Sequence, residues 1–184
     1  AVSSDRDTGV QLLFYDTPGF VHVKETQSGE EKGRLARSVM VSAREAIDGG
    51  DVVLLVVDAA KAMSKDHARR LAFLLDELMP GFDLEAPERF ILVLNKVDLV
   101  HPKSTLLVRT QELLSLLVAA KAKQMVSSPR GAIEEAARAC PVYMVSSRKD
   151  DGVADIRSFL QQSSAPGHWL FDGEEAVESE LTDE

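Results

Sequence analysis

The sequence predicts an α/β domain in which helices cover both faces of a mostly parallel β-sheet. Short apolar runs alternate along the chain with longer stretches whose apolar residues recur at helical spacing. Three of the four apolar runs also end directly at polar residues of kinds that bind ligands. Strands that alternate with helices of this length pair in parallel, because each helix returns the chain to the same end of the sheet.

Four apolar runs are the predicted strands: 10–15, 51–58, 90–94 and 141–145. The run at 51–58 holds six consecutive aliphatic residues, which is typical of a strand buried on both faces. The predicted helices are 33–47, 64–79, 104–126, 132–138 and a last one that covers 155–161 and starts near 151. Gly49-Gly50 and Pro80-Gly81 end the first two of these helices.

Composition describes one ordinary globular domain: 184 residues, of which 45% are apolar and 28% charged. The net charge of −9 repels nucleic-acid phosphates, so this part is not expected to bind RNA itself. A single cysteine excludes an internal disulfide framework and a cysteine-clustered zinc site, and it fits a reducing intracellular compartment. The longest apolar run is too short to span a bilayer, and the first residues do not resemble a signal peptide.

The run Asn95-Lys96-Val97-Asp98 directly follows a predicted buried strand. The carboxylate of Asp98 can accept hydrogen bonds from the ring N–H and the exocyclic amine of guanine, whereas adenine offers no matching donor pair. Asn95 can join neighbouring loops, and the stem of Lys96 can lie flat over a purine face. The alternative is a strand-to-helix turn with ordinary Asn and Asp capping.

Two further loops follow predicted strands. In Asp16-Thr17-Pro18-Gly19, a carboxylate can hold Mg²⁺ through a water, and Gly19 lets a backbone N–H approach a γ-phosphate; the alternative is a proline-glycine turn. Ser146-Ser147-Arg148 follows the last strand, where backbone N–H groups could meet the carbonyl oxygen of guanine. By its composition this loop is only serine-rich. Its position directly after a predicted strand is what favours a role in ligand binding.

These three motifs, in this order, resemble the translation-factor class of P-loop GTPases, and the sequence is similar within that class to the Era family of ribosome-assembly GTPases. The NKVD run is followed by Lys103 and a leucine-rich helix, as in that family. The segment Pro166-Gly167-His168-Trp169, with Leu181-Thr182-Asp183 downstream, resembles the family's link to an RNA-binding KH domain. The resemblance implies a Ras-like GTPase fold and covers nearly the whole chain.

The resemblance also implies the roles of individual residues. Asp16 would bind Mg²⁺ through a water, and Asp16, Thr17 and Gly19 would lie on the phosphate side. The guanine side would comprise the residues Asn95, Lys96, Asp98, Ser146 and Ser147. Ser147 departs from the usual alanine, which a backbone contact tolerates. Phe20 stands where Ras-like enzymes place a water-orienting glutamine, so no catalytic residue is identified and slow hydrolysis is expected.

No Gly-x-x-x-x-Gly-Lys-Ser/Thr phosphate-binding loop occurs in the chain. We therefore expect residues 1–165 to be a partial GTPase domain without its first strand and P-loop, inactive and poorly folded by itself. Residues 166–184 are expected to lead to a KH domain outside the chain.

Three functional hypotheses follow. The first is a GTP-binding, slowly hydrolysing Era-like GTPase that acts in small ribosomal subunit assembly. The second is a degenerate, non-hydrolysing docking module, and the third is a tRNA-modification or double-domain ribosome GTPase of the same class. The expected cofactors are GTP or GDP and Mg²⁺, and the partners are small-subunit ribosomal RNA with ribosomal proteins or assembly factors. The protein is expected to be monomeric and intracellular, in the mitochondrial matrix rather than the bacterial cytoplasm.

Overall fold

The structure, a computed structural model, describes residues 1–17, 41, 49–78, 86, 89–124 and 130–171. The chain divides into two compact units. Residues 17–153 form one unit, and residues 1–16 form the other together with residues 154–184.

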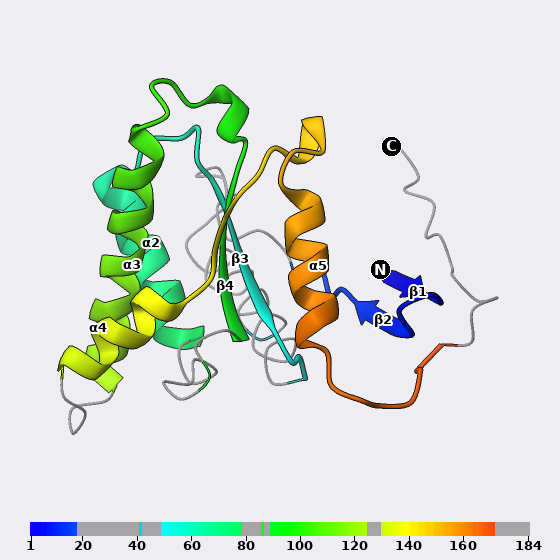
Figure 1. Ribbon diagram of the computed structural model, residues 1–184. Helices are drawn as coiled ribbons and strands as arrows, with labels where there is room; N and C mark the ends of the chain where they lie inside the picture. Colours follow the sequence, from blue (N-terminus) through cyan, green and yellow to red (C-terminus); the bar gives the residue numbers. More distant parts are fainter. Residues whose placement is uncertain (18–40, 42–48, 79–85, 87–88, 125–129, 172–184) are drawn as a thin grey trace, which may run out of the picture. The chain divides into compact units, whose positions relative to one another are not determined.

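The larger unit is built on a three-stranded parallel sheet with the strand order β3-β4-β5 (Figure 1). Its strands are β3 (Val53–Asp58), β4 (Phe90–Asn95) and β5 (Val142–Met144). The register pairs Asp58 with Asn95, the last residues of β3 and β4, so both strands end at the same level. The predicted α/β architecture with a parallel sheet is confirmed.

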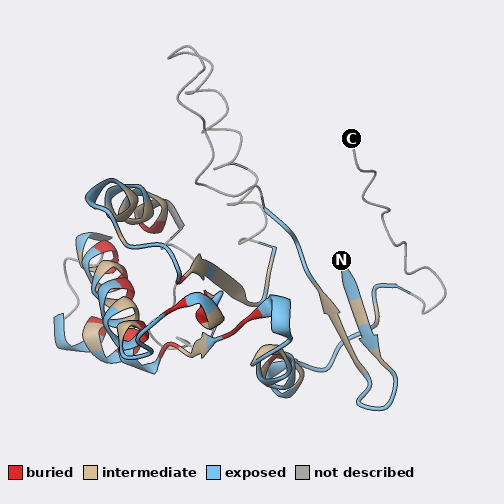
Figure 2. Cartoon of the chain, turned by 90° about the horizontal axis from the view of Figure 1, so that it is seen from above, coloured by how far each residue is buried: buried red, intermediate tan, exposed pale blue. Residues whose placement is uncertain are grey.

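Helices α2 (Lys65–Leu78), α3 (Thr105–Gln124) and α4 (Arg130–Ala139) belong to this unit. All three begin and end within a few residues of the predicted bounds. The Ser64 hydroxyl oxygen accepts a hydrogen bond of 3.1 Å from the backbone N–H of His67 and so caps the start of α2. Buried residues of the helices face the sheet, as the burial colours in Figure 2 show.

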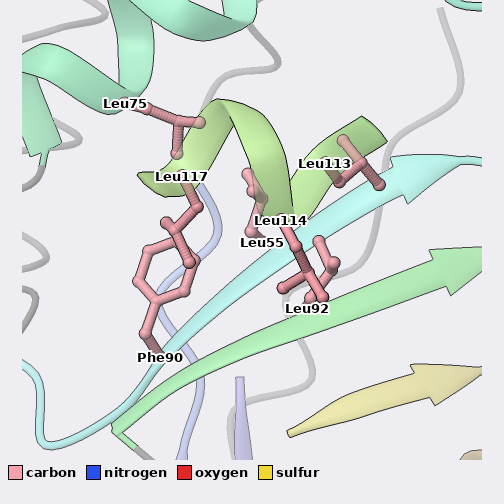
Figure 3. Close-up of a pocket in the computed structure, with 7 residues that line it drawn as sticks. All are labelled: Leu55, Leu75, Phe90, Leu92, Leu113, Leu114 and Leu117. Atoms are coloured by element: carbon pink, nitrogen blue, oxygen red, sulfur yellow. The ribbon is translucent and has the colours of Figure 1, made fainter. Parts of the chain in front are cut away.

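One face of the sheet packs on these helices in a continuous apolar core. Leu92 and Leu94 of β4 meet Leu75 of α2 and Leu113 and Leu117 of α3 in this core. A cavity of about 10 Å³ remains among leucine and phenylalanine side chains, with no polar group in its lining (Figure 3). A void this small and apolar has no partner for a water molecule, so it is a packing defect and not a ligand site.

Burial of the strands differs from the prediction in one respect. The run at 51–58 was expected to be buried on both faces, but Val56 is 58% exposed. Within the described residues β3 pairs with β4 alone, whereas β4 lies between two strands and has buried residues at 90–94. A continuous apolar run therefore identified the strand correctly but not its burial.

The smaller unit contains an antiparallel hairpin of β1 (Val2–Asp5) and β2 (Val10–Leu13) and most of α5 (Val153–Ser163). The strand predicted at 10–15 is β2, but its described partner is antiparallel, outside the parallel sheet. β1 was not predicted, because Val2-Ser3-Ser4-Asp5 is short and polar and carries little strand signal. Asp5 accepts hydrogen bonds from the backbone N–H groups of Asp7 and Thr8 and thereby shapes the connecting turn.

The segment after α5 is fastened to this hairpin. The Gln11 carboxamide donates to the carbonyl oxygen of Phe171 at 2.9 Å and accepts from the backbone N–H groups of Leu170 and Phe171 at 2.9 and 3.1 Å. The indole N–H of Trp169 donates to the carbonyl oxygen of Gly9 at 3.2 Å. Part of the segment predicted as a linker is thus bound to β2.

Some predictions fall outside the described residues. The helix predicted at 33–47 is one of them, except that Val41 is described and helical. In the described part of the chain, no helix is long and apolar enough to cross a membrane.

Candidate functional site

The carboxyl ends of the three parallel strands meet at one edge of the sheet, which is where open α/β sheets bind ligands. Backbone hydrogen bonds fix this edge. The N–H of Ala59 donates to the carbonyl of Asn95 at 2.9 Å, and the N–H of Val97 donates to the carbonyl of Val145 at 3.1 Å. The loops after β3, β4 and β5 are therefore held to one another, and we call them together the strand-end edge, residues 58–61, 95–103 and 145–152.

Asn95 joins two of these loops through a single atom. Its Oδ1 accepts hydrogen bonds from the backbone N–H of Lys96 at 2.7 Å, from the backbone N–H of Ser147 at 3.1 Å and from the Ser147 hydroxyl at 2.9 Å. Sequence reasoning had offered the Ser147 N–H to a guanine carbonyl, whereas here it donates to Asn95. The side chain ties the NKVD loop to the loop after β5.

Asp98 lies in the short 3-10 helix η3 (Val97–Leu99), and its side chain is only 11% exposed. Its Oδ1 accepts a hydrogen bond of 2.8 Å from the hydroxyl of Ser146, a fully buried residue. Its Oδ2 lies 3.8 Å from the ammonium of Lys149. The Ser146 hydrogen bond is the main cause that holds the pKa of Asp98 below its ordinary value; burial opposes it, and Lys149 reinforces it.

Asp98 is consequently ionised at neutral pH, and a carboxylate accepts hydrogen bonds only. Ser146 fixes one of its oxygens, and both oxygens keep lone pairs for further donors. Such a group suits a ligand edge with two adjacent N–H donors. Recognition of guanine by Asp98 stays a prediction.

Lys96 precedes η3 with a left-handed backbone, at φ 64° and ψ 33°. Its ammonium lies 2.8 Å from Oδ2 of Asp58 at the end of β3. Burial tends to raise the pKa of Asp58, but hydrogen bonds from Lys96 and from the backbone N–H of Ala60 outweigh it and lower this pKa below its ordinary value. The two side chains form an ion pair across the ends of β3 and β4.

The loop after β5 closes on itself. Ser146 and Asp151 exchange backbone hydrogen bonds of 2.9 and 3.2 Å around η4 (Ser147–Lys149). Asp150 and Gly152 adopt positive φ values of 54° and 75° to complete this turn. A Cβ at Gly152 would lie 2.8 Å from the carbonyl oxygen of Met144, so only glycine fits there without a shift.

The structure brings the predicted guanine-side residues together at this edge: Asn95, Lys96, Asp98, Ser146 and Ser147. On the phosphate side, Asp16 and Thr17 are exposed residues after β2, while Gly19 and Phe20 lie outside the described residues. Sequence reasoning missed Asp58 and Lys149. The available sequence signal for Asp58 was its place at the end of a predicted strand; its position level with Asn95 comes from the register of the sheet.

No cluster of acidic, histidine or cysteine side chains that could hold a metal ion by itself occurs among the described residues. A lone carboxylate such as Asp16 holds Mg²⁺ only together with waters and phosphate oxygens. The chemistry of Asp16 suits that shared mode of binding.

The chain is similar over most of its length to curated GTPases. It is 29% identical to GTPase Era of Erythrobacter litoralis over 171 residues, which are 93% of this chain and 44% of that protein. It is 38% identical to GTPase Era of a Geobacter species over 101 residues, 55% of this chain and 28% of that protein. A chloroplastic GTPase ERA-like protein of rice, Oryza sativa subsp. japonica, is 36% identical over 92 residues, 50% of this chain and 18% of that protein.

The parallel α/β fold and these matches are consistent with a segment of a P-loop GTPase domain. The predicted resemblance to the Era family of GTPases is confirmed, because curated proteins named GTPase Era match most of the chain at 26–29% identity. The chain spans less than half the length of these relatives. No family profile matches the chain, and no solved structure matches it significantly.

Proposed function

We propose that this chain supplies the guanine-recognition side of an Era-like GTPase, which binds GTP and GDP with Mg²⁺ and hydrolyses GTP slowly. The observation that carries the proposal is the position of Asp98. Its ionised carboxylate is held by Ser146 at the carboxyl ends of parallel strands, where a base with two adjacent N–H donors can bind. Similarity to proteins named GTPase Era supports guanine over other bases.

On the phosphate side, Asp16 would bind Mg²⁺ through a water, and Thr17 and Gly19 would face the phosphates. The complete protein would provide a glycine-rich amide cradle and its lysine for the phosphates. Phe20 offers no hydrogen bond to an attacking water, so turnover would be slow without help from other groups or a partner.

We further propose that the complete protein acts on the small ribosomal subunit and contacts its RNA through a KH domain. The support is the relationship to GTPase Era together with the net charge of −9, which disfavours RNA binding by this chain itself. The segment bound to the hairpin by Gln11 and Trp169 would lead toward that domain. A mitochondrial location stays a prediction, and two of the relatives are chloroplastic.

The base-recognition step is tested with Asp98→Asn in the complete protein. An amide presents one acceptor and one donor, so it mismatches guanine and matches the extra carbonyl of xanthine. We expect weaker GTP binding and a shift of preference toward XTP, measured as the two dissociation constants. Asp66→Asn on α2 is the matched control, because Asp66 is 77% exposed and pairs only loosely with Arg69 at 3.6 Å.

Unchanged GTP affinity in Asp98→Asn would remove the base-recognition proposal. If the parent protein binds GTP tightly but never hydrolyses it under any ribosome-containing condition, the non-hydrolysing docking module replaces the enzyme. The RNA step is tested by recovering small-subunit RNA with the complete protein and with a version that ends at Glu184. Equal recovery would place the RNA contacts inside residues 1–184 and contradict the KH-domain proposal.

A further inference from the structure

We propose that Asp58 is a positioning residue of the nucleotide site, which holds Lys96 so that its aliphatic stem is preset as a platform for the purine face. This inference rests on the proposed function of the strand-end edge and adds a residue from β3 to it. The NKVD pattern contains Lys96 but gives no hint of what holds its side chain in place.

The geometry fixes both ends of the lysine. Its backbone N–H donates to Oδ1 of Asn95 at 2.7 Å, and its ammonium donates to Oδ2 of Asp58 at 2.8 Å. Asp58 and Asn95 are register partners on neighbouring strands, so the two anchors stand at the ends of β3 and β4. The methylene groups of Lys96 are held between these two anchors, and Asp98, the proposed base-recognition residue, follows two residues further along the chain.

Asp58 is itself held in place. Its Oδ1 accepts a hydrogen bond of 3.0 Å from the backbone N–H of Ala60, and the N–H of Ala59 donates to the carbonyl of Asn95 at 2.9 Å. One oxygen of the carboxylate is therefore fixed by the backbone, and the other points at Lys96. The side chain of Asp58 is 22% exposed, while that of Lys96 is 52% exposed. Asp58 is therefore the fixed partner, and the side chain of Lys96 loses rotamer freedom by pairing with it.

Pre-organisation of this kind strengthens binding because a long, flexible side chain has already lost its rotamer freedom before the ligand arrives. A half-exposed ion pair contributes modestly and is weakened by salt. We therefore expect loss of Asp58 to weaken guanine-nucleotide binding about two- to fivefold, with a smaller effect at high ionic strength. GTP and XTP should be affected equally, because the stem contacts the flat face of the base and not its edge.

The test is a double-mutant cycle in the complete protein, read as the dissociation constant of a fluorescent GDP. The variants are Asp58→Ala, Lys96→Ala and the double variant, with Asp58→Asn as the conservative change. If Asp58 acts through Lys96, the double variant binds no more weakly than Lys96→Ala alone. Asp58→Asn should recover part of the affinity, because an amide oxygen still accepts from the ammonium.

Arg69→Ala is the control, because Arg69 is a basic residue of α2, outside the strand-end edge, and its exposed ion pair with Asp66 is loose at 3.6 Å; the affinity of this variant should match the parent. Thermal melting shows that each variant is folded at the assay temperature. If the parent protein binds no guanine nucleotide, the proposed function itself is wrong. If the parent binds but Asp58→Ala binds equally well, or the two single effects add in the double variant, only the role of Asp58 is wrong.

Discussion

Replacement of Gly152 by alanine should destabilise the turn that follows β5 and thereby disturb the strand-end edge. Gly152 has φ +75°, and a Cβ added there would lie 2.8 Å from the carbonyl oxygen of Met144 and 3.2 Å from Cγ1 of Val145. A left-handed backbone costs a non-glycine residue about 1–2 kcal/mol, and forcing an extra carbon into a packed site costs about 1–3 kcal/mol. The sum predicts a loss of about 2–5 kcal/mol of unfolding free energy.

The assay is chemical denaturation of the complete protein, followed through the transition that includes the parallel sheet. Gly131→Ala is the matched control, because Gly131 is helical in α4 and has open space where its Cβ would lie. That change should stabilise the protein by up to about 1 kcal/mol, since alanine is the better helix former. If Gly152→Ala unfolds at the parental denaturant concentration, our account of the turn between Ser146 and Gly152 is wrong.

Three further outcomes are expected. Asp16→Ala in the complete protein should reduce GTP hydrolysis and the Mg²⁺ dependence of GTP binding, measured by phosphate release across a Mg²⁺ titration; the parental rate would make that loop only a turn. Gln11→Ala should free the segment at Trp169, the single tryptophan of the chain, and raise its acrylamide quenching, whereas the exposed Gln162→Ala should not. Burial raises the pKa of Cys140 to about 11, so folding stability is full below the thiol's ordinary pKa of 9.0 and falls as pH rises toward 11; denaturation midpoints between pH 8 and pH 11 measure this, and a flat profile would contradict it.

The order of strands and helices in the parallel unit was predictable because each element carries its own local signal. The continuous apolar run of β4 and the Pro80-Gly81 pair that follows α2 in the sequence can be recognised without knowledge of tertiary structure. The hairpin was different, because Val2–Asp5 forms a strand through pairing with β2 and not through its own composition. Strand pairing depends on tertiary structure, and the composition of a four-residue polar segment does not predict its pairing partner.

The grouping of side chains at the strand-end edge was predictable to a similar extent and for a similar reason. Asn95 and Asp98 belong to one short motif, and their chemistry follows from residue type. Asp58 and Lys149 were missed because their importance depends on which side chains face them across the sheet edge. The hydrogen bond from the backbone N–H of Ser147 to Asn95 was missed for the same reason, because it joins two loops that are far apart in the sequence.

Backbone strain among the described residues gathers at this same edge. The non-glycine residues with positive φ are Lys96 and Asp150, and both lie in loops that follow the parallel strands. Such conformations cost of order 1–3 kcal/mol each and persist only where the surroundings hold them firmly. Here Asn95 binds the N–H of Lys96, and the Ser146–Asp151 pair encloses Asp150. Relaxation of either turn would disturb the alignment of Asp98 with Ser146. The local strain therefore keeps an ionised carboxylate fixed in direction. Recognition of a base edge requires a carboxylate fixed in this way.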